Sequence, residues 1–116
     1  MVIRMDEREK AAIYRFHAAF CKCLGDASRL MLITQLEDGE VSVGELSQQL
    51  GLPQASVSKH LAILREHGLV AARRQGATIF YSLSDPRICQ AISILKQVQV
   101  DLLDRRHEMA LRGAGL

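Results

Sequence analysis

The apolar positions of residues 43–67 recur at helical spacing and predict two consecutive short helices. In the second of these, Val57, Leu61 and Leu64 are spaced by four and three residues and so form one stripe. The positions off this stripe are small, polar or mildly basic: Gln54, Ala55, Ser58, Lys59 and Ala62. Such side chains carry the amide, hydroxyl and ammonium groups that contact base edges and phosphates. This helix therefore has one face for a core and one face suited to nucleic acid.

The junction between the two helices has the residues of a tight turn. Gly51 is a good C-terminal stop for the helix over residues 43–50. Pro53 suits the first position of the next helix, because its missing N–H costs nothing there. Two helices joined by Gly-Leu-Pro predict a helix-turn-helix over residues 43–67.

Two strand-like runs follow the helix-turn-helix, after Gly68. They cover residues 69–74 and 78–83 and flank the short segment Gln75-Gly76-Ala77. This pattern predicts a hairpin, or wing, over residues 69–83 with a basic tip that contains a glycine. A helix-turn-helix followed by such a hairpin is a winged helix-turn-helix.

The segment before residue 43 predicts two further helices. The first covers residues 6–24, and its apolar stripe is formed by Ile13, Phe16 and Phe20. Asp26 can cap the second helix, which runs to about Gly39. A stripe of Leu30, Ile33 and Leu36 makes this second helix amphipathic.

The segment after the wing predicts a long final helix over residues 85–110. Asp85 suits its cap and Pro86 its first helical position, and we expect the tail beyond Asp104 to fray. Two apolar stripes run side by side along this helix: Ile88, Ile92, Leu95 and Leu102, and then Ala91, Ile94 and Val98. Two stripes favour a helix that a partner subunit covers as well. The alternative is a fully buried helix in a monomer.

Three motifs in this chain, taken in this order, resemble the ArsR/SmtB family of bacterial repressors. They are Leu24-Gly25-Asp26-Ala27-Ser28-Arg29-Leu30, then residues 51–61, and then residues 68–83. The resemblance covers residues 20–85. It implies a homodimer that binds operator DNA as a repressor, leaves it on meeting an inducer, and dimerises through the first and last helices.

The fold class that we predict is therefore mainly α with a small β-hairpin, in the order α-α-α-α-β-β-α. A chain of 116 residues, 48% of them hydrophobic, suits one domain over residues 1–116. The net charge is only +2, but its distribution is uneven. Residues 26–50 carry a net charge of −4 and residues 53–81 a net charge of +3, with histidines neutral. The positive segment holds the helix and wing that would meet DNA.

Other features of the sequence narrow the class of protein. No apolar run approaches the roughly 20 residues of a membrane span, and we see no signal peptide. Three cysteines in a chain of this size do not make a disulfide scaffold, so we expect a reducing cytoplasm. We see no acid–base pair, phosphate loop or nucleophile constellation, so an enzyme is not expected.

A two-fold dimer would place two recognition helices in successive major grooves, on an inverted-repeat operator. We expect bases or adjacent phosphates to be contacted by Gln54, Ser56, Ser58 and Lys59. His60 fits a structural role and a DNA-contacting role equally well. In the wing, Arg73, Arg74 and Thr78 are expected to meet phosphate or the minor groove. The alternative for the two arginines is an exposed strand that protects itself with charge.

The inducer site is harder to predict. The family has a cysteine pair in the first helix of the helix-turn-helix. That pair is absent here, because residues 45–50 contain no cysteine. The family's zinc site on the last helix lacks both of its histidines here. The remaining candidates for sensing are Cys21, Cys23 and Cys89.

Three thiolates suit arsenite, as the resemblance implies, or a soft ion such as Cd²⁺ or Zn²⁺. Two thiols could instead form a disulfide or a polysulfide bridge. Cys21 and Cys23 are two residues apart, however, and on a continuous helix they point to nearly opposite sides. A site of Cys89 with one of them avoids this difficulty. The alternatives are three buried core cysteines and a DNA-binding regulator without a sensor.

Overall fold

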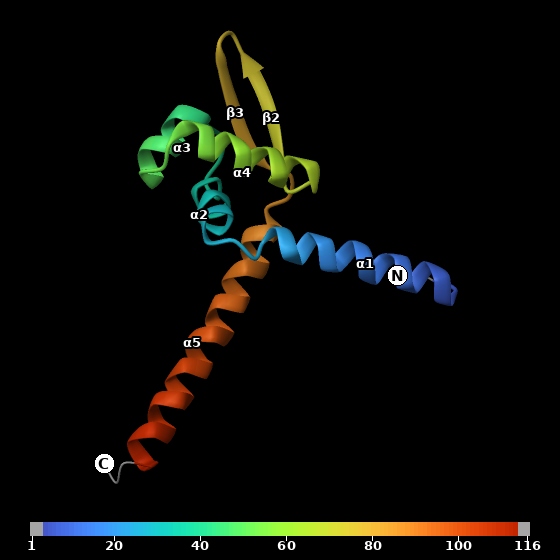
Figure 1. The fold of residues 1–116 in the computed structure, drawn as a ribbon, viewed down its shortest axis with the longest axis vertical. Coiled ribbons are helices and arrows are strands. Elements are labelled where there is room, and N and C mark those ends of the chain that lie inside the picture. Colours follow the sequence, from blue (N-terminus) through green and yellow to red (C-terminus); the bar gives the residue numbers. More distant parts are fainter. Residues whose placement is uncertain (1–3, 114–116) are drawn as a thin grey trace. The chain divides into compact units, whose positions relative to one another are not determined.

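The computed structural model describes residues 4–113, in two units that meet between Ser84 and Asp85. The first unit contains seven elements: α1 (Glu7–Cys23), α2 (Ala27–Gln35), β1 (Val41–Ser42), α3 (Val43–Leu50), α4 (Gln54–Glu66), β2 (Val70–Gln75) and β3 (Thr78–Leu83). The second unit is one long helix, α5 (Arg87–Gly113) (Figure 1). The predicted winged helix-turn-helix and its element order are confirmed. The strand β1 was not predicted, because two residues are too short to show an alternating pattern.

The core of the first unit is aliphatic and centres on α4. Val57, Leu61 and Leu64 are fully buried, as the stripe predicts. They pack with the buried side chains of α2, its C-cap and α3, which are Leu32, Ile33, Leu36 and Leu46. Burying one such side chain contributes about 1.5–3 kcal/mol to stability, so this cluster fixes the rotation of α4 about its axis.

The turn between α3 and α4 is closed by backbone and side-chain hydrogen bonds. Gly51 ends α3 in the left-handed conformation, with φ of 64°. The Ser47 hydroxyl donates to the carbonyl of Leu52 at 2.6 Å, and the Ser47 carbonyl accepts from the Leu52 N–H at 3.2 Å. The predicted place of Pro53 is wrong by one residue. Pro53 is the N-cap and α4 begins at Gln54, since Pro53 keeps an extended ψ of 140°.

The wing is part of a three-stranded antiparallel sheet in the order β1-β3-β2. Its two long strands are joined by a two-residue turn at Gly76, where φ is 62°. A positive φ at the first turn position is the pattern of a type II′ hairpin, which glycine adopts without strain. The wing starts at Val70, one residue later than predicted, because the Leu69 N–H donates to the Leu64 carbonyl near the end of α4 at 2.9 Å.

The caps of the first two helices follow the sequence. Asp6 and Glu9 form a capping box at the start of α1. Asp26 caps α2 by accepting from the Arg29 N–H at 3.1 Å. The second helix ends at Gln35 rather than near Gly39, since residues 36–39 form a turn.

The helix α5 differs from its prediction at both ends. It begins at Arg87, after Pro86, and the carboxylate of Asp85 accepts from the Arg87 N–H at 2.9 Å. The tail beyond Asp104 was expected to fray, but α5 continues to Gly113. Residues 114–116 lie outside the described residues. All residues of α5 from Ser93 to Gly113 are exposed.

No helix within residues 4–113 combines the length and the apolar character needed to cross a membrane.

We predict that Leu61→Ala lowers the free energy of unfolding by about 2–5 kcal/mol, because it opens a cavity in the core below α4. Urea denaturation at a fixed protein concentration measures the effect. Lys59→Ala is the matched control on the exposed face of the same helix, with an expected change within about 0.5 kcal/mol. Equal effects of the two substitutions would contradict the assigned rotation of α4.

Candidate nucleic-acid interface

The exposed face of α4 carries the small and polar side chains that the sequence predicts to lie off the apolar stripe. Gln54, Ala55, Ser58, Lys59 and Ala62 are all exposed, while the stripe on the opposite side is buried. The helix lies beside the hairpin of β2 and β3, and α4 packs on β2 (Figure 1). We call this exposed face of α4 the reading face, because it is predicted to contact DNA. The reading face and the wing therefore belong to one surface region of the first unit.

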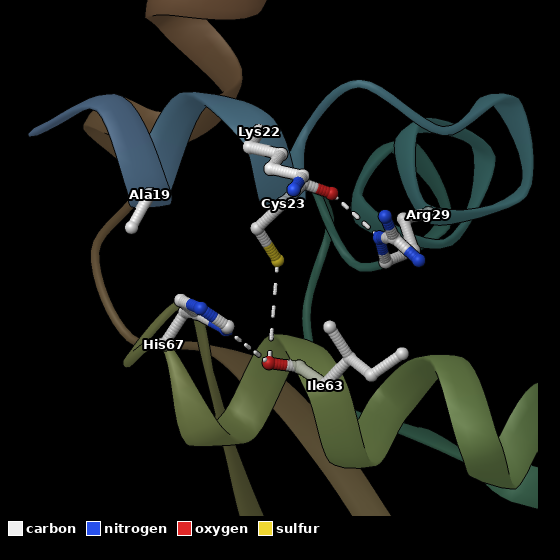
Figure 2. A pocket seen from close by; sticks show the side chains of 6 residues that line it. All are labelled: Ala19, Lys22, Cys23, Arg29, Ile63 and His67. Atoms are coloured by element: carbon white, nitrogen blue, oxygen red, sulfur yellow. Dashed lines mark hydrogen bonds between the residues drawn. The ribbon is translucent and has the colours of Figure 1, made fainter.

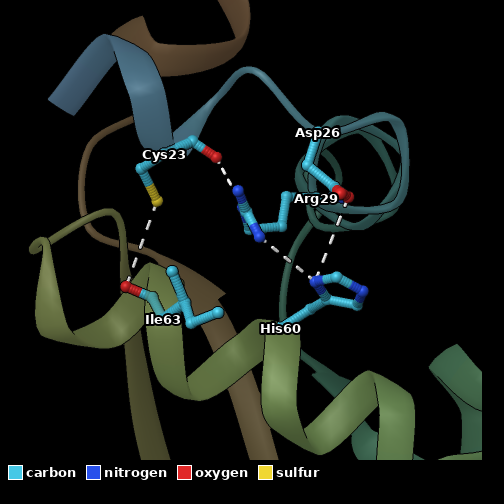
Figure 3. Close-up of polar contacts among 5 residues, drawn as sticks. All are labelled: Cys23, Asp26, Arg29, His60 and Ile63. Atoms are coloured by element: carbon cyan, nitrogen blue, oxygen red, sulfur yellow. Dashed lines mark hydrogen bonds and ion pairs between the residues drawn. The ribbon is translucent and has the colours of Figure 1, made fainter. Parts of the chain in front are cut away.

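Two of the residues expected near DNA are less exposed than the others. The His60 side chain is only 22% exposed, and its Nδ1 lies 3.4 Å from Nη1 of Arg29 and 4.0 Å from Oδ1 of Asp26. Figure 3 shows this imidazole directed at the start of α2. Ser56 precedes His60 by four residues, so it lies on the same side of α4, and it is half-buried. Of the two roles weighed for His60, this geometry favours the structural one.

A polar network joins α1, α2 and α4 behind the reading face. Arg29 Nε donates to the carbonyl of Cys23 at 2.5 Å, and Nη1 of the same side chain faces His60 (Figure 3). The backbone hydrogen bond from Arg29, with the charges of Arg29 and His60, lowers the pKa of Asp26. Arg29 was not singled out from the sequence. The sequence places Arg29 three residues after the helix cap Asp26, which predicts the backbone hydrogen bond between them. It could not predict the contact with His60, which is distant in the chain.

The wing places its two arginines in different surroundings. Arg74 is exposed, and its Nε donates to the carbonyl of Gly76 at 3.3 Å. Arg73 is exposed as well, but it donates from Nη2 to Glu40 at 2.6 Å, and its guanidinium lies 4.8 Å from the centre of the Phe80 ring. The hydrogen bonds from Arg73 lower the pKa of Glu40, and the same bonds raise the pKa of Arg73. Thr78 is exposed at the start of β3.

The two cysteines of α1 face different ways, as their spacing predicts. Cys21 is exposed, and its Sγ lies 3.6 Å from Nε2 of His17. Cys23 is buried, and its Sγ lies 4.0 Å from the carbonyl of Ile63 in α4. Burial raises the pKa of the Cys23 thiol, an effect that the charge and hydrogen bond of Arg29 oppose. Cys89, in α5, is also buried.

Cys23 also borders a pocket of about 280 Å³ between α1, α2 and α4 (Figure 2). The other lining residues are Ala19, Lys22, Arg29, Ile63 and His67. His67 Nδ1 donates to the carbonyl of Ile63 at 2.9 Å, so this imidazole sits at the edge of the core. Within residues 4–113, no group of three or more His, Cys, Asp or Glu side chains is placed to hold a metal ion.

The fold and this surface define a winged helix-turn-helix protein of the DNA-binding class. A family model described as "Bacterial regulatory protein, arsR family" matches residues 26–72. The biofilm growth-associated repressor of Xylella fastidiosa is 44% identical over 78 residues, which are 67% of this chain and 68% of that protein. The chain belongs to the arsR family of bacterial regulatory proteins, whose members are DNA-binding transcriptional regulators and not enzymes.

Solved structures agree with this assignment. The crystal structure of M. tuberculosis Rv0081 has a TM-score of 0.74 and 34% identity, and the match covers 81% of this chain and 95% of that one. The homodimeric winged helix-turn-helix domain of Mb0332 from Mycobacterium bovis has a TM-score of 0.76 and 26% identity. That match covers 90% of this chain and 95% of the other.

We predict that iodoacetamide alkylates Cys21 of the reduced folded protein much faster than Cys23, because Cys21 is exposed whereas burial raises the pKa of Cys23. Peptide mapping by mass spectrometry at several times and pH values measures the two rates. In urea the two rates should converge. Similar rates in the folded protein would contradict the burial of Cys23.

Proposed function

We propose that the chain is a cytoplasmic homodimeric repressor that binds an inverted-repeat operator through α4 and the wing. One observation carries this proposal: the exposed face of α4 is made of Gln54, Ser58 and Lys59 beside the basic hairpin, while its apolar face is fully buried. Glutamine can pair with adenine through two hydrogen bonds, and lysine can neutralise a phosphate. Arg74 and Thr78 of the wing complete the proposed contact set.

The dimer is proposed from apolar side chains that remain exposed on two helices. Tyr14 and Phe16 of α1 are 74% and 73% exposed, and Ile94 and Leu95 of α5 are 66% and 60% exposed. Exposed apolar side chains at this density mark an interaction surface. The related domain Mb0332 is described as homodimeric, and we assign α1 and α5 as the helices that a second copy covers.

A two-fold dimer accounts for the form of the proposed operator. The two copies of α4 would enter successive major grooves about one helical turn, or roughly 34–36 Å, apart. Each half-site would then be read by the same residues in opposite orientation, which gives an inverted repeat. In this arrangement His60 faces Arg29 and Asp26 at the start of α2, and it positions α4 without touching the bases. Ser56 lies on the same side of α4.

We further propose that the inducer acts at cysteine thiols, with arsenite or a soft ion such as Cd²⁺ or Zn²⁺ as the first candidate. The exposed thiol of Cys21 beside His17 is the observation that favours a thiol site. Cys23 and Cys89 are the other candidate thiols. Disulfide or polysulfide chemistry is the alternative, and a regulator without a sensor is the third possibility.

The DNA-binding proposal is tested by selecting duplexes from a random library and titrating them by fluorescence anisotropy. We expect salt-dependent binding to an inverted repeat. Gln54→Ala should cost about 1–3 kcal/mol on the selected sequence and relax the preference at one base pair. Lys59→Gln should reduce the slope of log K against log salt by about 1.8, which is one phosphate per subunit.

Lys10→Gln is the control, because it removes the same charge from an exposed site near the start of α1. It should leave the slope unchanged. A protein that binds no duplex at low salt contradicts the DNA-binding proposal, and an unchanged slope for Lys59→Gln contradicts the role of Lys59.

Native mass spectrometry of the reduced protein tests the dimer and the inducer together. We expect a dimer that gains one arsenic or metal per subunit and loses thiol protons, and Cys→Ser variants at the three positions should identify the ligands. A mass change for a disulfide or for added sulfur would support the alternative chemistry. A monomer at micromolar concentration contradicts the dimer, and a dimer that ignores arsenite, Cd²⁺, Zn²⁺ and an organic polysulfide contradicts the thiol sensor.

A further inference from the structure

We propose that Arg73 is a positioning residue that braces the wing against the start of the helix-turn-helix, and that it does not contact phosphate. Arg74, its neighbour on β2, carries the electrostatic contact of the wing. The inference rests on the proposed DNA-binding function.

The Arg73 side chain spans the whole width of the sheet. Arg73 on β2 pairs with Phe80 on β3, and Phe80 pairs with Ser42 on β1. The guanidinium lies over the Phe80 ring, at 4.8 Å from its centre, and reaches Glu40 just before β1. Nη2 donates to Oε1 of Glu40 at 2.6 Å and Nε donates to Oε2 at 3.0 Å. The Arg73 side chain therefore joins β2 to the residue just before β1, across β3.

This contact reaches the segment just before the helix-turn-helix. Glu40 stands two residues before Ser42, which is the N-cap of α3 and accepts from the Glu45 N–H at 3.2 Å. The brace therefore joins β2 of the wing to the segment that starts α3 and α4. A bidentate arginine–carboxylate pair fixes orientation as well as distance. It can thus set the position of the hairpin tip relative to the reading face of α4.

The guanidinium of Arg73 is already engaged on all of its nitrogens. Nε and Nη2 bond to Glu40, and Nη1 donates to Oε1 of Gln75 at 3.0 Å. Nη1 and Nη2 each keep one N–H outside these bonds. A phosphate that approached them would lie beside the Glu40 carboxylate, which repels it. Arg74 points to the other face of the sheet, because successive residues of a strand alternate. Within the described residues it makes one hydrogen bond, to Gly76, and its charge is not paired with an acid there.

The two roles make opposite predictions for Glu40. If Arg73 bound phosphate, Glu40→Gln would release the guanidinium and remove a negative charge near DNA, so binding would tighten. If Arg73 acts as a brace, Glu40→Gln frees the wing, so binding weakens despite the removed charge.

The test measures affinity for the selected duplex between 50 and 200 mM salt, for Arg73→Gln, Glu40→Gln, the double variant and Arg74→Gln. We expect Arg73→Gln and Glu40→Gln each to weaken binding about tenfold, and the double variant to be no weaker than either, because both remove one interaction. The salt slope should stay unchanged for Arg73→Gln and fall by about 1.8 for Arg74→Gln. Thermal melting checks that each variant is folded.

A salt slope that falls equally for Arg73→Gln and Arg74→Gln overturns the inference, as does tighter binding by Glu40→Gln or an additive double variant. In each case the wild type still binds DNA and the proposed function stands. If the wild type binds no duplex, amide hydrogen exchange tests the brace by itself. Arg73→Gln and Glu40→Gln should then speed exchange in β1 and its partner residues of β3, with Arg74→Gln as the control, and unchanged exchange overturns the inference.

Discussion

The burial of one apolar stripe on α4 is the constraint on which the rest of the first unit depends. Val57, Leu61 and Leu64 can leave water only by packing against α2 and α3, and this fixes the rotation of α4. Once that rotation is fixed, Gln54, Ser58 and Lys59 have to face outward beside the wing. The aliphatic core thus determines the direction of the polar face of α4. That face contributes little to stability, but the proposed function requires it.

Polar contacts add directional constraints on the relative positions of elements that the apolar core packs together. Behind α4, Arg29 connects the end of α1 to His60, and on the sheet Arg73 connects the wing to Glu40. Apolar packing is non-directional, whereas a guanidinium fork has fixed geometry. Both arginines lie at joints between elements that the core alone would hold loosely. The elements around the exposed face of α4 are therefore connected by charged side chains as well as by the core.

The cysteines show how the surroundings decide the chemistry of one residue type. Cys21 and Cys23 share a helix and are two residues apart, yet one is exposed beside His17 and the other is buried against Ile63. Burial raises the pKa of Cys23, and a protonated thiol is a poor nucleophile and a poor metal ligand. Any chemistry at Cys23 has to overcome this desolvation, whereas Cys21 is open to solvent.

Periodicity, glycines and caps in the sequence were enough to determine the winged helix-turn-helix and the side of α4 that is exposed, because these signals act between residues close in the chain. They could not reveal β1, whose two residues pair with a strand about forty positions away. Nor could they separate Arg73 from Arg74, or settle the direction of His60, since their partners Glu40 and Arg29 are 33 and 31 residues distant. The surroundings of these side chains depend on contacts that exist only after the chain has folded, so only the tertiary structure decided them.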